Sequence, residues 1–100
     1  MQTALIVTSE AQGTRMRQHL EVSNLHVDHA LDARCAHQRL NQKQYDMVLI
    51  DTTSPPVDGW ILLRSIRKFS DVPIMLIAGD EANDAILGLS LGADDCVSYN

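Results

Sequence analysis

Three short stretches of the sequence are continuously apolar and end in polar or turn-forming residues; they are residues 4–7, 47–50 and 72–78. Strands of a parallel sheet that is covered by helices on both faces have this unbroken character, whereas half-exposed strands alternate apolar and polar residues. Two weaker segments, the alternating residues 25–29 and the short residues 96–98, are typical of edge strands. We therefore expect five strands, with the three apolar ones inside the sheet.

The intervals between these segments carry apolar residues at helical spacing, such as Met16 and Leu20 ahead of the second strand. Strand and helix thus alternate, which predicts right-handed crossovers and a doubly wound α/β sheet. With the two weaker strands at the edges, the strand order is 2-1-3-4-5, the flavodoxin-like arrangement. Because ligands bind such sheets at the carboxyl ends of strands where the order reverses, we expect the functional site just after Val7 and Ile50.

Residues suited to helix ends fall between the periodic segments. Asn24 follows the first helix, where a left-handed cap is expected, and Gly92 fits the end of the fourth. Asp58 and Asp80 precede the third and fourth helices as N-caps. These positions agree with the helices that the apolar spacing predicts.

The composition is that of an ordinary globular domain, with 45% hydrophobic and 21% charged residues in a chain of 100, and we expect residues 1–100 to form one domain. The net charge is −5 and the basic residues are scattered, so we expect no direct contact with nucleic acid. No apolar run approaches the ~20 residues of a membrane span. The two cysteines, Cys35 and Cys96, lack metal-ligand spacing, and a cytoplasmic location is expected.

Asp51 is the one carboxylate that its strand places directly at the predicted crevice. In that position a carboxylate can attack a phosphoryl group or hold a cation. It can equally be a structural strand-end residue that accepts hydrogen bonds from Thr8, Ser9 or nearby backbone amides. The residue types alone leave these two interpretations open.

Several sequence blocks carry a resemblance to one family: residues 5–7, residues 45–51, the pattern Asp51…Pro55…Asp58-Gly59, residues 63–67, residues 71–74 and residues 87–95. The last block, Leu-Gly-Leu-Ser-Leu-Gly-Ala-Asp-Asp, is the most specific. From residue 4 to residue 98 the chain resembles the receiver domain of bacterial two-component response regulators, most closely the OmpR/PhoB type. This resemblance implies that Asp51 is the position that accepts a phosphoryl group from a histidine kinase.

In that family Mg²⁺ is held by the acceptor Asp, an acidic pair after the first strand and a backbone carbonyl two residues beyond the Asp. Here the acidic pair is replaced by Thr8 and Ser9. Mg²⁺ normally takes one or two carboxylates in octahedral geometry, so we expect no metal cofactor unless Asp51 and Glu10 suffice, with Glu10 acting through water. We expect Thr8 and Ser9 to donate hydrogen bonds to Asp51 instead.

Other positions that act in phosphorylation also differ from what the resemblance implies. The hydroxyl residue that ends the fourth strand is Ala78, or Ile77 by a count from Gly92. The Lys after the fifth strand is Tyr99, and the aromatic residue that moves on activation is Cys96. We therefore expect an atypical receiver whose site is set in one state without phosphate.

The remaining candidates have more ordinary interpretations. His26, His29, Cys35 and His37 are close in sequence, but His26 and His29 lie on opposite faces of a strand, which argues against one metal site. Trp60 is expected to cover the start of the third helix. Asp94 and Asp95 are expected to cap the turn into the fifth strand. No nucleophilic triad or phosphate loop is present, so no enzyme activity is expected.

The resemblance also implies partners. A winged-helix DNA-binding effector domain is expected beyond residue 100, together with a final receiver helix that residues 1–100 lack. A homodimer is expected through the fourth helix and fifth strand, over residues 84–92 and 96–98. Two alternatives remain open: a conventional phospho-accepting receiver that uses Asp51 with Glu10, and a flavodoxin-like nucleotide or flavin binder that uses residues 8–13.

Overall fold

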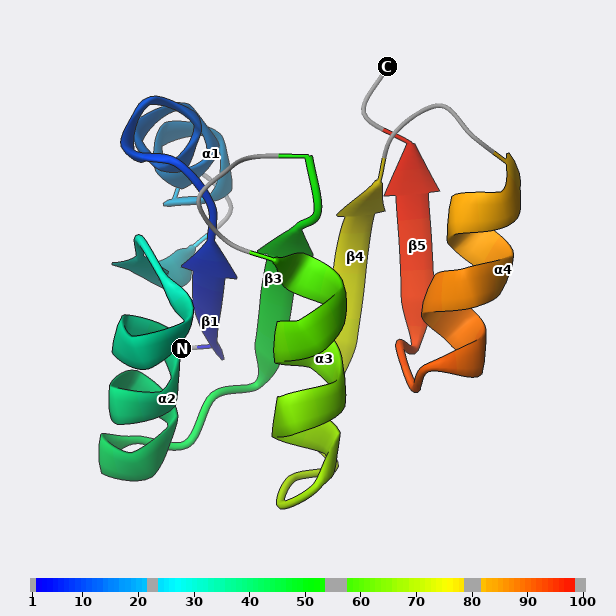
Figure 1. The fold of residues 1–100 in the computed structure, drawn as a ribbon. Coiled ribbons are helices and arrows are strands. Elements are labelled where there is room, and N and C mark those ends of the chain that lie inside the picture. The colour runs from blue at the N-terminus through cyan, green and yellow to red at the C-terminus, as the bar shows by residue number, and fades with distance from the viewer. Residues whose placement is uncertain (1, 22–23, 54–57, 79–81, 99–100) are drawn as a thin grey trace.

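The computed structural model describes residues 2–21, 24–53, 58–78 and 82–98. Strands and helices alternate along the chain: β1 Gln2–Val7, α1 Glu10–Glu21, β2 Leu25–Ala30, α2 Ala33–Gln42, β3 Met47–Asp51, α3 Gly59–Arg67, β4 Ile74–Ala78, α4 Ala82–Ser90 and β5 Asp95–Ser98. The five strands form one parallel sheet in the order β2-β1-β3-β4-β5 (Figure 1). The predicted fold class, doubly wound and flavodoxin-like, is confirmed.

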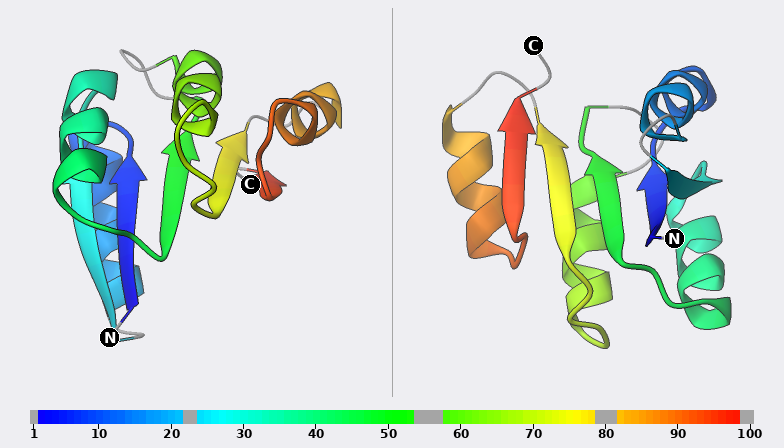
Figure 2. Two further views of the ribbon diagram at one scale, coloured as in Figure 1. Left: turned by 90° about the horizontal axis from the view of Figure 1, so that it is seen from below. Right: turned by 180° about the vertical axis from the view of Figure 1, so that it is seen from behind.

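The sheet separates two apolar clusters, because successive residues of a strand point to opposite faces. In β1, Leu5 and Val7 belong to the larger cluster, beneath α2, α3 and α4, while Ile6 joins the smaller one with α1. Met16 and Leu20 are the α1 residues that pack there, as their spacing predicts. On the face of the sheet where α1 packs, no helix in the described part of the chain covers β4 and β5, as the rear view in Figure 2 shows.

The predicted helix ends fall within a residue or two of the observed ones. Asn24 has a φ of 63°, in the left-handed region, and Gly92 has a φ of 114°. Asp58 is the N-cap of α3, where its carboxylate accepts hydrogen bonds from the amides of Trp60 and Ile61. Asp80, expected to cap α4, lies outside the described residues. Among the described residues, no helix is long and apolar enough to span a membrane.

The edge strand β2 carries a cluster of charges around Asp28. Tyr45 Oη donates a 2.6 Å hydrogen bond to Asp28 Oδ2, and Lys43 Nζ donates one of 3.3 Å to the same oxygen. His26 Nε2 lies 3.3 Å and Arg39 Nη1 4.0 Å from Oδ1. Burial acts to raise the pKa of Asp28, but the hydrogen bonds from Tyr45 and Lys43 and the nearby cations outweigh it and hold that pKa below its usual value.

This cluster predicts a loss of stability at both ends of the pH range. Because the pKa of Asp28 is lower in the folded protein than its unfolded value of about 4, the ionised Asp28 stabilises the fold at pH values above about 4. That contribution disappears as the pH falls through the folded pKa. Burial and the hydrogen bond to Asp28 raise the pKa of Tyr45, so its contribution is lost as the pH rises above about 10. Urea unfolding of the wild type and Asp28→Asn across pH checks this: the variant should have a flatter acid limb, and identical limbs would contradict the prediction.

Candidate functional site

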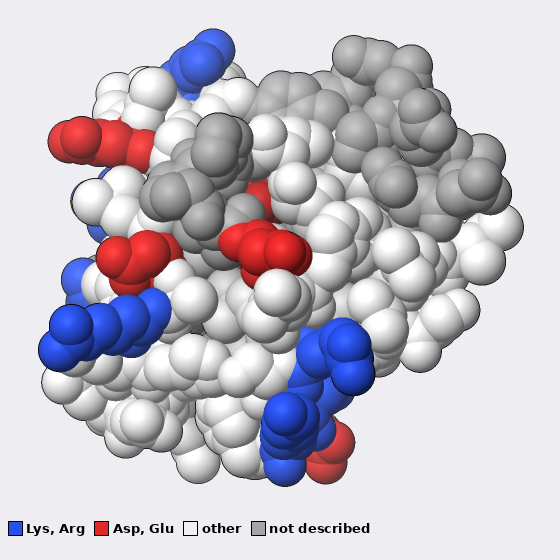
Figure 3. All heavy atoms as spheres, in the orientation of Figure 1, with Lys and Arg blue, Asp and Glu red and all other residues white. Residues whose placement is uncertain are grey.

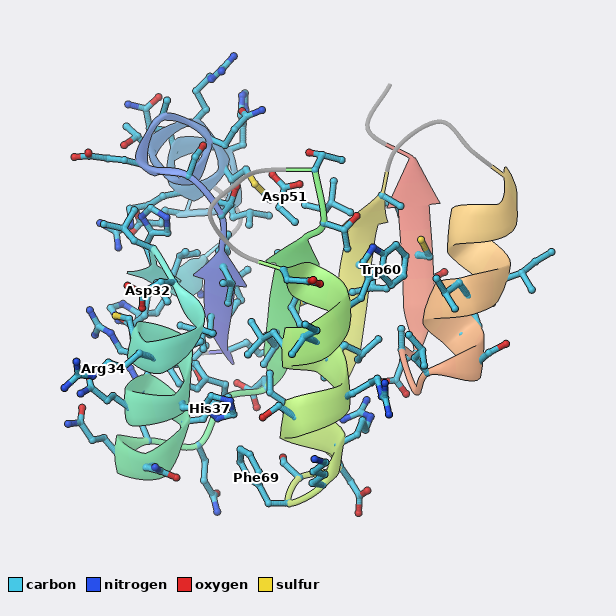
Figure 4. All side chains as sticks on the ribbon, in the orientation of Figure 1. Asp32, Arg34, His37, Asp51, Trp60 and Phe69 are labelled. Atoms are coloured by element: carbon cyan, nitrogen blue, oxygen red, sulfur yellow. The ribbon has the colours of Figure 1, made fainter. Side chains whose placement is uncertain are left out.

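The site lies where β1 and β3 end side by side. Val7 is paired with Ile50 in the parallel register, so the residues that follow, Thr8 and Asp51, reach the same edge of the sheet. Both side chains are fully buried, with 0% of their surface exposed. Figure 4 shows Asp51 at the carboxyl end of β3. The functional site was predicted where the strand order reverses, and a buried carboxylate lies at that point of the sheet.

Each oxygen of the Asp51 carboxylate accepts hydrogen bonds. Thr8 Oγ1 donates a 2.7 Å bond to Oδ2. The amide of Thr53 donates a 2.8 Å bond to Oδ1, and Thr53 Oγ1 donates to the same oxygen at 2.5 Å. Bonds to an ionised acceptor are roughly twice as strong as neutral ones, so these donors stabilise the carboxylate away from water.

Ser9 does not join Thr8 at Asp51, in contrast to the expectation from the sequence. Its hydroxyl accepts a 3.4 Å hydrogen bond from the Gln12 amide, and its carbonyl accepts one of 2.8 Å from Gly13. Ser9 thus caps the first turn of α1, because the first amides of a helix have no partner within it. Glu10 is the exposed first residue of α1.

The resemblance pointed only to the backbone carbonyl of residue 53, and sequence reasoning missed that the Thr53 amide and hydroxyl donate to Asp51. The available signal was its spacing, since an Asp side chain often accepts a hydrogen bond from the amide two residues ahead in an Asx-turn. The neighbouring Thr52 has another role: its amide and its hydroxyl both donate to the Ile77 carbonyl, at 2.9 and 3.0 Å. These bonds connect the end of β3 to β4 beside the site.

The other predicted positions are apolar or lie outside the described chain. Asp51 is paired with Ile77 in the register of β3 and β4, and Ala78 is the next residue of β4. Ile77 and Ala78 are both buried and carry no hydroxyl. Cys96 is half-buried in β5 and packs against the larger apolar cluster. Tyr99 lies outside the described residues.

A histidine supports the backbone of the site from the neighbouring edge strand. His29 Nε2 lies 3.0 Å from the Thr8 carbonyl oxygen, and the ring occupies the space beside Gly13. A Cβ on Gly13 would come within 2.2 Å of that ring, so α1 can approach β2 here only because residue 13 is glycine. His29 is therefore close to Thr8, although no role at this site was expected for it.

The histidines and Cys35 are dispersed rather than gathered. His26 is near Asp28, His29 is near Thr8, and His37 contacts Ser65 on α3. Within the ranges that the structure describes, no group of three or more His, Cys, Asp or Glu residues is arranged to hold a metal ion.

Trp60 is half-buried and packs against the larger cluster, where it points from α3 toward β4 in Figure 4. A Cβ on Gly88 of α4 would lie 3.5 Å from the Trp60 ring. Trp60 therefore lies between α3 and α4, whereas the sequence interpretation placed it over the start of α3.

The donor set around Asp51 does not match the needs of Mg²⁺. The ion requires near-octahedral oxygen ligands and is normally bound through one or two carboxylates together with phosphate oxygens and water. Here Thr8 and Thr53 direct hydrogen-bond donors at both Asp51 oxygens, and the Ser9 hydroxyl is engaged at the start of α1. Each oxygen of the Asp51 carboxylate thus faces at least one neutral hydrogen-bond donor.

A doubly wound parallel sheet of order β2-β1-β3-β4-β5, with a buried Asp where the strand order reverses, defines a flavodoxin-like α/β protein with its candidate site at that point of the sheet. The family model of the response regulator receiver domain matches residues 5–99. The chain belongs to the response regulator receiver family.

Relatives with curated names agree with this family. The chain is 43% identical over 79 residues to a CpxR homolog, a transcriptional regulatory protein of Haemophilus influenzae, covering 78% of this chain and 34% of that protein. It is 33% identical over 95 residues to the transcriptional activator IrlR of Burkholderia pseudomallei, covering 93% and 42%. The chain thus spans less than half the length of either relative.

A solved structure agrees as well. The receiver domain of TorR, a response regulator of the TMAO respiratory system, superposes with a TM-score of 0.88 at 27% identity, over 99% of this chain and 84% of that one. The resemblance seen in the sequence blocks is confirmed, and the homologues are transcriptional regulators of the OmpR/PhoB type.

Proposed function

We propose that this chain is an atypical receiver that regulates transcription without accepting a phosphoryl group. The observation that supports this most is the state of Asp51, whose side chain is 0% exposed and whose two oxygens accept hydrogen bonds from Thr8 and Thr53. A carboxylate must present a lone pair to a phosphoryl donor in order to attack it. In this proposal the Asp51 carboxylate is instead a fixed structural part of the site.

Electrostatics also argue against a phosphoryl group at Asp51. The modification would bring roughly two negative charges into a site without the family's second and third carboxylates to hold a cation. At an effective dielectric constant near 20, each missing opposite charge at ~4 Å represents about 4 kcal/mol of lost attraction. The buried Ile77 and Ala78 offer no hydroxyl to bind the phosphoryl oxygens.

The proposed partners follow from the family and from the exposed surface of this chain. The effector is a DNA-binding domain in the same polypeptide, as the transcriptional regulators among the relatives suggest, and DNA contact belongs to that domain. A homodimer through α4 and β5 is supported by exposed apolar residues there; they are Ile86, Leu87, Leu89 and Val97. A histidine kinase is then not required for activity, the location is cytoplasmic, and the chain has no catalytic role of its own.

The direct test is incubation with Mg²⁺ and acetyl phosphate followed by intact mass spectrometry. We expect no phosphoryl adduct on the wild type, because Asp51 is buried and the site binds Mg²⁺ poorly. A conventional receiver treated in parallel shows that the reagent is active. Asp51→Asn is the matched control, since it keeps the shape of the side chain and removes the nucleophile.

A stable adduct on the wild type that is absent from Asp51→Asn would instead identify a conventional phospho-accepting receiver. Glu10, which is exposed at the start of α1, would then be the residue to test next for a part in metal binding. The alternative of a nucleotide or flavin binder is tested by titration with FMN and ATP, for which the proposal expects no saturable binding.

A further inference from the structure

The outer face of α3 carries a row of side chains around a shallow hollow. Arg64, Ser65 and Lys68 lie three, four and seven residues after Ile61, which places all four on one side of the helix. Together they line a hollow of about 300 Å³. Ile61 is 65% exposed, and Arg64 and Lys68 are exposed beside it. We call this set the α3 face.

Contacts with α2 hold the floor of the α3 face in position. Ser65 Oγ lies 2.9 Å from His37 Nε2, and the His37 ring packs at 5.5 Å from the ring of Phe69. Phe69 is 53% exposed, so a second large apolar side chain lies just beyond Lys68. Figure 4 shows His37 directed from α2 toward α3, with Phe69 below it. The hollow is thus a surface with a fixed base and not a chance gap beside a flexible side chain.

The two cations of the α3 face differ from the other basic residues nearby. Arg67, on the same helix, donates to the carbonyls of Gly92 and Val72 and pairs with Asp94. No ion pair in the described parts of the chain includes Arg64 or Lys68. Figure 3 shows basic side chains over the lower part of α3 and over α2, with acidic side chains higher on that face and one beside the lowest basic ones. The α3 face thus carries two cations without an ion pair in the described chain, between the exposed Asp58 and Asp71, in a protein of net charge −5.

We propose that the α3 face is a docking surface for an acidic segment of a partner protein. Apolar residues form the core of protein interfaces, Arg is enriched there, and charges complementary to the partner steer the encounter. Two cations four residues apart match carboxylates at the same spacing on a partner helix. The partner segment then carries at least two carboxylates and one bulky apolar side chain that covers Ile61.

A displayed library of random peptides tests this surface without assuming a particular partner. The wild-type chain is the bait, and the recovered binders are then compared on the wild type and on Arg64→Glu/Lys68→Glu. We expect the recovered peptides to be enriched in Asp and Glu with a bulky apolar residue. Their affinity should fall about tenfold or more for the charge-reversed variant, and severalfold for Ile61→Ser. Amide NMR shifts of the wild type on binding should concentrate on residues 61–69 and His37.

The matched control is Arg15→Glu/Arg17→Glu, which makes the same change of net charge on α1 and should bind the peptides as the wild type does. Equal loss of affinity in this control would overturn the proposal, since it would show unspecific charge attraction. Recovered peptides without acidic enrichment, or NMR shifts outside the α3 face, would also overturn it. Binding of single-stranded DNA or RNA that the α3 variants abolish would assign the surface to nucleic acid instead. If Arg64→Glu/Lys68→Glu does not fold, Arg64→Gln/Lys68→Gln takes its place.

Discussion

Replacing Arg67 by methionine should lower the free energy of unfolding by about 3 kcal/mol, because three partly buried backbone carbonyls lose their donor at once. Its Nε donates to the Gly92 carbonyl at 2.7 Å, and Nη1 donates to the carbonyls of Val72 at 2.6 Å and Ser70 at 3.2 Å. Its Nη2 lies 2.8 Å from Asp94 Oδ2. This one side chain therefore connects α3 with the residues just before β4 and with the turn between α4 and β5.

Urea denaturation of Arg67→Met checks this expectation, with Arg64→Met as the control on the exposed side of the same helix. The Arg64 variant should change stability by less than about 0.5 kcal/mol. Arg67→Lys should recover little of the loss, because an ammonium is a point donor and cannot reach several carbonyls in one plane. If Arg67→Met and Arg64→Met are equally stable, the inferred role of Arg67 is wrong.

Thr8→Asp should destabilise the chain strongly in the presence of EDTA and become stabilised by Mg²⁺. The Thr8 hydroxyl lies 2.7 Å from Asp51 Oδ2 in a site where both side chains are fully buried. The substitution removes a donor and places a second carboxylate there, so we expect a loss of about 3 kcal/mol without metal. A divalent cation would relieve this repulsion, and binding only to the folded state raises its stability.

Thermal unfolding with increasing Mg²⁺ measures this effect. The wild type should show no increase in Tm beyond that caused by ionic strength, which matched NaCl additions measure. Thr8→Asn is the matched variant, because it has the shape of Asp without the charge, and it should not respond to Mg²⁺. An equal response of the wild type and Thr8→Asp would contradict our account of the site.

Much of the fold was predictable because its signals lie in adjacent residues. The unbroken apolar run 47–50 corresponds to β3, and residues 4–7 lie within β1. Asn24 and Asp58 end and begin helices as their side-chain chemistry predicts. Strand order also followed, because the less apolar strands occupy the edges, where burial is lowest. Asp51 and Thr8 could then be placed close together, because each lies at the carboxyl end of one of two adjacent parallel strands.

The hydrogen bonds within the site were harder to predict, because a hydroxyl chooses among acceptors a few ångströms apart. Thr8 was expected at Asp51 and bonds to it, but Ser9, one residue later, lies at the start of α1 and accepts from Gln12. Thr53 took the place expected for Ser9, through a turn whose geometry depends on how the chain leaves β3.

By itself the sequence determined the alternation of strands and helices, the family and the position of the buried acidic residue, since these depend on periodicity and residue type. Only the tertiary structure decided which distant groups meet. Asp94 was expected to act as a local cap, yet it accepts hydrogen bonds from Arg67 and from the Ile74 amide, 27 and 20 residues away. Contacts between residues so far apart depend on how whole elements pack, and no local pattern of residues carries that information.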